Sequence, residues 1–116
     1  MADEIKAMLS WVPFEKGGRK LRPSGPTYST LVRFDEDDSW PAETWSLRME
    51  FIRSYADGKY VYARVSFVSP DAPQGLLHEG SRFQLYEGRR LVATGLVRAA
   101  DVVPSESNEF EQKLLH

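Results

Sequence analysis

Apolar and polar residues alternate with a period of two along much of the chain. Between residues 45 and 51 the apolar positions are Trp45, Leu47, Met49 and Phe51, with Ile52 fitting less cleanly, and residues 61–67 repeat the pattern. Such alternation is typical of β-strands that bury one face. Residues 4–13 fit a strand or a helix, and we favour a strand because a segment beside a β-rich body usually joins its sheet. Shorter stretches predict three more strands, at 28–34, 82–86 and 91–97.

Glycine-containing pairs separate these stretches. Gly17-Gly18, Asp57-Gly58 and Glu87-Gly88 each lie between apolar alternations, and we predict a hairpin-type turn at each because glycine accepts positive φ. Gly95 falls inside the last predicted strand and indicates a bulge or a bend there. Six short strands with regular turns predict a barrel or a sandwich. We expect one domain over residues 1–103, with a polar tail over 104–116.

Composition narrows the class of protein. The chain has 116 residues, of which 41% are hydrophobic, enough for one compact core. No apolar run is long enough to span a membrane. The first residues are acidic and no apolar segment of the signal-peptide type follows them, so we expect a cytoplasmic protein. The absence of cysteine excludes disulfides, thiol catalysis and cysteine metal sites.

The usual signatures of catalysis are missing from the sequence. The two histidines, His78 and His116, lack the spacing of a metal site, and we expect His78 to be an exposed loop residue. No phosphate-binding glycine loop and no nucleophile elbow occurs. The acidic run 35–38 lacks the spacing of a calcium loop. We therefore predict no enzymatic activity, no cofactor, no metal and no nucleotide.

Charge is unevenly distributed along a chain whose formal net charge is −2. An acidic run at 35–38 and an acidic tail contrast with two basic stretches. Basic loops on an acidic body remain compatible with local phosphate binding. The first basic stretch contains Lys16, Arg19, Lys20 and Arg22, and the second contains Arg82, Arg89, Arg90 and Arg98.

Residues 79–97 read Glu-Gly-Ser-Arg-Phe-Gln-Leu-Tyr-Glu-Gly-Arg-Arg-Leu-Val-Ala-Thr-Gly-Leu-Val. This segment resembles the end of the third, C-terminal domain of elongation factor Tu, with Arg89 where the family has the second glycine of its turn. Upstream, 68–70 resembles a family strand end and 15–19 a family turn, in the same order over residues 4–98. The matching positions are Gly80, Arg82, Phe83, Glu87, Gly88, Arg90, Val92, Gly95 and Val97.

The resemblance implies an all-β fold, a six-stranded antiparallel barrel of Greek-key type. In the family this barrel helps to bind the T-arm of aminoacyl-tRNA and contacts protein partners, while the nucleotide chemistry belongs to another domain. We therefore expect a non-catalytic module that binds tRNA or another structured RNA, or a protein of the translation apparatus. The alternative is a protein–protein module, such as an immunity, antitoxin-like or regulatory protein. The sequence leaves the oligomeric state open.

Eight residues are candidates for the binding surface, and each has a second interpretation. Arg89 and Arg90 either hold phosphate at a hairpin tip or are solvated turn residues. Tyr62 is predicted on the outward face of its strand, where it either anchors a partner or is present only because tyrosine favours β-strands. Trp40 is either an exposed anchor or a loop residue folded over a barrel end. The remaining candidates are Lys16, Arg19, Lys20 and Arg22, which either extend the same basic surface or form a solvated loop.

Overall fold

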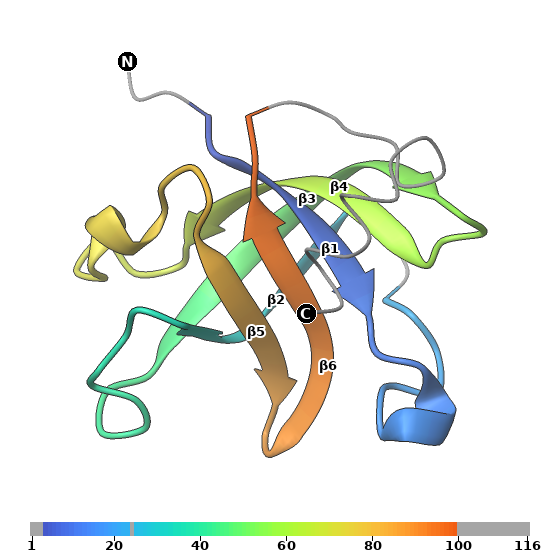
Figure 1. Ribbon diagram of the computed structural model, residues 1–116, viewed down its shortest axis with the longest axis horizontal. Helices are drawn as coiled ribbons and strands as arrows, with labels where there is room; N and C mark the ends of the chain where they lie inside the picture. The colour runs from blue at the N-terminus through green and yellow to red at the C-terminus, as the bar shows by residue number, and fades with distance from the viewer. Residues whose placement is uncertain (1–3, 24, 100–116) are drawn as a thin grey trace.

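The computed structural model describes residues 4–23 and 25–99, and its elements within them are six β-strands and two short 3-10 helices, η1 and η2 (Figure 1). The prediction of six strands is confirmed, and residues 4–13 contain a strand rather than a helix. The elements are β1 (Lys6–Trp11), η1 (Phe14–Lys16), β2 (Thr27–Phe34), β3 (Trp45–Tyr55), β4 (Tyr60–Phe67), η2 (Gln74–Leu76), β5 (Arg82–Glu87) and β6 (Arg90–Val97).

The strands form a closed antiparallel barrel in the order β1-β4-β3-β2-β5-β6. The first two strands each pair with a strand distant in the sequence. β1 pairs with β4 and β6, and β2 pairs with β3 and β5. β2, β3 and β4 follow one another around the barrel, and β1 lies beside β4, which is the connection of a Greek key. The predicted six-stranded antiparallel barrel is therefore confirmed.

Alternating side chains from all six strands fill the barrel interior. Phe34, Leu47 and Phe83 are almost completely buried there. Gly95 pairs in register with Phe83, and a Cβ atom at this position would overlap the Phe83 ring. The bulge of β6 lies elsewhere, because Leu85 pairs with Ala93 and Tyr86 with Leu91. Of the bulge or bend predicted at Gly95, the bulge is therefore wrong, and the glycine makes room for an aromatic neighbour.

Two of the three predicted hairpin turns are confirmed. Asp57-Gly58 connects β3 to β4 and Glu87-Gly88 connects β5 to β6, with positive φ at both glycines. Gly17-Gly18 was predicted wrongly, because β1 and β2 are not neighbours and the pair lies in the long connection between them. Gly17 instead ends η1 in the left-handed conformation, where its amide donates to the carbonyl of Phe14.

The described barrel falls within the expected domain 1–103. Residues 100–103 and the expected tail 104–116 lie outside the described residues, as does His116. Within 4–23 and 25–99, no helix has the length and apolar character needed to cross a membrane.

Candidate functional site

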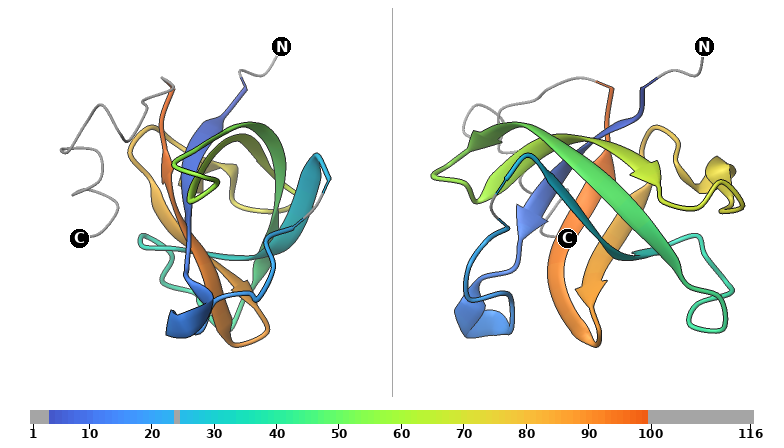
Figure 2. Two further views of the ribbon diagram at one scale, coloured as in Figure 1. Left: turned by 90° about the vertical axis from the view of Figure 1, so that its right-hand side faces the viewer. Right: turned by 180° about the vertical axis from the view of Figure 1, so that it is seen from behind.

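Three connections meet at one end of the barrel: the β1–β2 connection, the β3–β4 hairpin and the β5–β6 hairpin. The amide of Trp11 donates to the carbonyl of Lys59 (3.1 Å), and the amide of Val12 donates to that of Val92 (2.9 Å). The Arg22 guanidinium donates to the carbonyl of Asp57 (2.9 Å). In Figure 1 the first two connections lie at the right and the third at the bottom, and the left view of Figure 2 looks onto this end.

We call this end the basic end, because its three connections bring the first basic stretch together with Arg89 and Arg90 of the second. Arg82 and Arg98 lie at the opposite ends of β5 and β6. The three connections carry seven basic and three acidic residues. The acidic residues are Glu15, Asp57 and Glu87, and the basic residues are Lys16, Arg19, Lys20, Arg22, Lys59, Arg89 and Arg90.

The opposite side of the barrel, which we call the acidic end, is built by the loops 35–44 and 68–81 (Figure 2, right view). These loops carry seven acidic residues and neither lysine nor arginine. His78 of one loop contacts Glu36 of the other, with 2.6 Å between Nε2 and Oε1. The acidic residues are Asp35, Glu36, Asp37, Asp38, Glu43, Asp71 and Glu79.

Glu87 holds the basic end together from the last position of β5. Its carboxylate pairs with the Arg19 guanidinium and accepts a hydrogen bond from the Tyr28 hydroxyl. Burial alone would raise the pKa of Glu87, but these two hydrogen bonds and the charges of Arg19 and Arg90 lower it overall. Burial and the bond to Glu87 raise the pKa of Tyr28 to about 12. Glu87 is therefore ionised, Tyr28 is neutral, and arginines from both basic stretches lie around one carboxylate.

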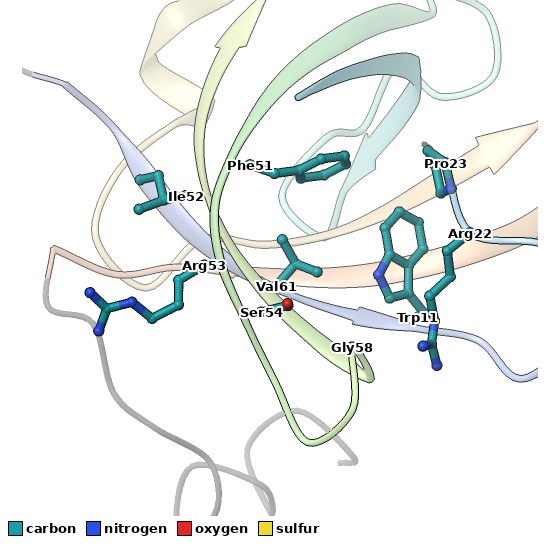
Figure 3. A pocket seen from close by; sticks show the side chains of 9 residues that line it. All are labelled: Trp11, Arg22, Pro23, Phe51, Ile52, Arg53, Ser54, Gly58 and Val61. Carbon is teal, nitrogen blue, oxygen red and sulfur yellow. The ribbon is translucent and has the colours of Figure 1, made fainter. Parts of the chain in front are cut away.

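Two hollows of about 300 and 400 Å³ open at this end, and both are lined by Trp11 and Arg22. In the smaller hollow, Trp11 and Arg22 come from the same side and Phe51 lies across from them (Figure 3). Trp11 packs edge-on against Phe51 and Tyr28, with ring centroids 6.2 and 6.1 Å apart. Trp11 is 7% exposed, so it forms an apolar floor rather than a projecting anchor.

The larger hollow has a rim that is both apolar and basic. Phe14 is 59% exposed and Leu21 is 74% exposed, and both line this hollow together with Lys20 and Arg22. Sequence reasoning missed Phe14 and Leu21. Their signal was present, since each is a large apolar residue in a polar, glycine-containing loop, with a lysine one or two positions away.

The structure divides the eight predicted site residues into three groups. Six of them lie at the basic end, with Arg19 paired to Glu87. Lys16, Lys20, Arg22, Arg89 and Arg90 are exposed there.

Trp40 belongs to the loop 35–44 rather than to the three connections of the basic end, and its partner Tyr86 is the residue before Glu87. The Trp40 ring stacks on that of Tyr86, with centroids 5.5 Å apart, and it is half-buried. Of the two interpretations of Trp40, the geometry favours a loop residue packed against the barrel over a projecting anchor.

Tyr62 is the candidate that the structure places among buried side chains rather than at an accessible surface. It points away from the barrel interior, as predicted, yet it is only 3% exposed. It forms a second buried cluster with Met8, Tyr60 and Leu96, and its hydroxyl donates to the carbonyls of Arg98 and Ala99. Period-two alternation separates the faces of a strand but does not say whether the outer face is covered.

No protein-family model, no curated protein and no solved structure matches this chain. Within the described part of the chain, histidine, aspartate and glutamate side chains form no group of three that could hold a metal ion. What the basic end offers chemically is a set of guanidinium and ammonium groups around two hollows with apolar floors.

Proposed function

We propose that the protein is a non-catalytic binding module whose basic end binds RNA. The observation that carries this proposal is that the first basic stretch meets Arg89 and Arg90, some seventy residues further along the sequence, around Glu87 at one end of the barrel. Guanidinium and ammonium groups on loops suit phosphate oxygens. Arg22 donates to Asp57, but a guanidinium has five N–H donors, so it can also bind a phosphate.

The resemblance to the third domain of elongation factor Tu adds to this proposal. In that family the barrel contacts a structured RNA, and segments 15–19 and 79–97, which carry the resemblance here, supply Arg19, Arg89 and Arg90 to the basic end. Structured RNA such as tRNA is therefore the preferred ligand.

Binding of labelled tRNA, followed by fluorescence anisotropy between about 50 and 200 mM salt, tests the proposal. Because phosphate contacts release counterions, we expect the logarithm of the affinity to fall linearly with that of the salt concentration. The double variant Lys20→Ala with Arg89→Ala removes two exposed charges and should flatten the slope by roughly 1.5. Affinity at low salt should fall about tenfold.

The matched control removes two arginines from the outer surface of β3 and β4, away from the basic end. Arg48→Ala with Arg64→Ala makes the same change in net charge, and both side chains are about half exposed, in ion pairs with Glu50 and Glu4. We expect a much smaller loss of affinity. Equal losses in the two double variants, or no tRNA binding by the wild type at low salt, would contradict the proposal.

A protein partner is the second candidate, favoured by the apolar rim at Phe14 and Leu21. Exposed aromatic residues beside arginine are typical of the energetic centre of protein interfaces. This candidate includes a translation protein, or an immunity, antitoxin-like or regulatory role. Its binding should depend on apolar contact, and the salt dependence should be correspondingly shallow.

A further inference from the structure

Phe14 and Leu21 are the large apolar side chains that lie exposed at the larger hollow of the basic end. Both line the 400 Å³ hollow, whose other walls include Lys20, Arg22 and the edge of Trp11. An aromatic ring surrounded by cationic side chains is the combination used to bind single-stranded nucleic acid, where bases stack and phosphates pair with charge.

The backbone holds Phe14 in this position. Phe14 begins η1, which Gly17 ends, and the amides of Lys16 and Gly18 both donate to the carbonyl of Pro13 at 3.0 Å. Gly18 packs so closely on the carbonyl of Val12 that a Cβ atom would overlap it. The loop therefore fixes the backbone of Phe14 beside the hollow, so the loop itself loses little conformational entropy when a ligand binds.

We propose that Phe14 is a stacking platform for the base of an unpaired nucleotide, with Lys20 and Arg22 binding the phosphates on either side of it. This inference rests on the proposed RNA-binding function and deepens it. The face of a base is accessible only where the RNA is unpaired and unstacked, whereas a duplex presents its backbone. The contact is therefore made to a loop, bulge or end of the RNA.

Charge complementarity favours an RNA segment as the occupant of this hollow. Lys20, Arg22 and Arg19 all line it, and none of the described residues in its lining is an aspartate or glutamate. Trp11 belongs to the core and is too buried to stack a base, so Phe14 is the ring at this hollow that offers a face.

Two labelled RNAs of about ten nucleotides, a single-stranded pyrimidine oligomer and a duplex, test the inference. We expect the wild type to bind the single strand about tenfold more tightly. Phe14→Leu keeps an apolar side chain but removes the aromatic face, and it should weaken single-strand binding about tenfold or more while leaving duplex binding unchanged. Phe14→Tyr keeps the face and should retain the affinity.

Val68→Ala is the matched control, because Val68 is 57% exposed and lies at the start of the loop 68–81. It should change neither affinity, and circular dichroism of each variant verifies the fold. If both RNAs bind and Phe14→Leu has no effect, or weakens both equally, the stacking platform is wrong and RNA binding stands. If neither RNA nor tRNA binds, the proposed function fails as well. Capture of an acidic protein, lost in Phe14→Leu, would replace both proposals with a protein interface.

Discussion

The two ends of the barrel differ in both charge and construction. The basic end has seven basic residues, exposed Phe14 and Leu21, and two hollows that meet at Trp11. The loops of the acidic end carry seven acidic residues, and their large aromatic residue, Trp40, is stacked on Tyr86. One end leaves apolar surface exposed among cations, while the other packs its tryptophan against the barrel.

A whole-chain charge of −2 conceals this separation. The net charge alone argues against a nucleic-acid ligand. The cationic side chains nevertheless make the electrostatic field near the basic end positive, and the local field governs the approach of a charged ligand. The separation also orients that approach, since an anionic partner is attracted to one end and repelled by the other.

The two ends share one core, and the largest expected effect comes from disturbing it. Gly95→Ala places a methyl group inside the Phe83 ring, and overpacking of this kind costs about 2–3 kcal/mol. We expect the midpoint of urea unfolding to fall accordingly. Variants that keep only Trp11, at the basic end, or only Trp40, in the loop 35–44, report unfolding through their fluorescence. Because one core is shared, both should show the same transition.

Gly75→Ala is the control for this substitution, because Gly75 has open space around its Cα and no positive φ. It should change stability by less than about 0.5 kcal/mol. Separate transitions at the two ends would mean that the ends unfold independently and do not share one cooperative core.

A smaller loss of stability is expected when only the contacts of Glu87 at the basic end are removed. Glu87→Gln removes the charge that Arg19 and Tyr28 bind, and should lower the free energy of unfolding at pH 7 by about 1 kcal/mol. Because folding lowers the pKa of Glu87, its contribution is present above the unfolded pKa near 4.5 and is lost as the pH falls through the folded value.

The difference in stability between wild type and Glu87→Gln should therefore shrink below about pH 4, which chemical unfolding at several pH values would measure. Glu43→Gln changes the same charge on an exposed residue of the acidic end and should have little effect. A pH-independent difference for Glu87→Gln would point to packing rather than charge.

The smallest effect on stability is expected at the acidic end, from the contact between His78 and Glu36. The backbone carbonyl of Glu79 and the carboxylate of Glu36 raise the pKa of His78 above its ordinary 6.5. Its link to Glu36 therefore contributes below the unfolded pKa and is lost as the pH rises through the folded one. An NMR titration should show a midpoint above 6.5 that Glu36→Gln moves down; a midpoint at or below 6.5 in the wild type would contradict this.

Local patterns were sufficient to predict six strands in a barrel or a sandwich, but they predicted neither which of the two forms nor the contacts within it. Alternation around Leu47 and Val65 identifies strands because burial of one face follows directly from the period of two. The reason for Gly95 could not be predicted, since it depends on Phe83, which the fold places opposite it. The burial of Tyr62 could not be predicted for the same reason, because it depends on Met8 and Leu96, which the fold places beside it.

The candidate site was partly predictable. Each basic stretch is visible in the sequence, but only the fold shows that Arg19 and Arg90 lie around the same carboxylate. The acidic end was equally hidden, since Asp71 and Glu79 are far from the 35–38 run in the sequence.

The closed barrel also constrains the order in which the protein can be made. β1 is synthesised before both of its neighbours, and its partners β4 and β6 begin 54 and 84 residues after it, at Tyr60 and Arg90. Local contacts cannot secure such a strand, and long-range pairing makes folding slow. The ribosome must therefore release β6 before the first strand can find its final place, and until then the edges of the growing sheet remain unpaired.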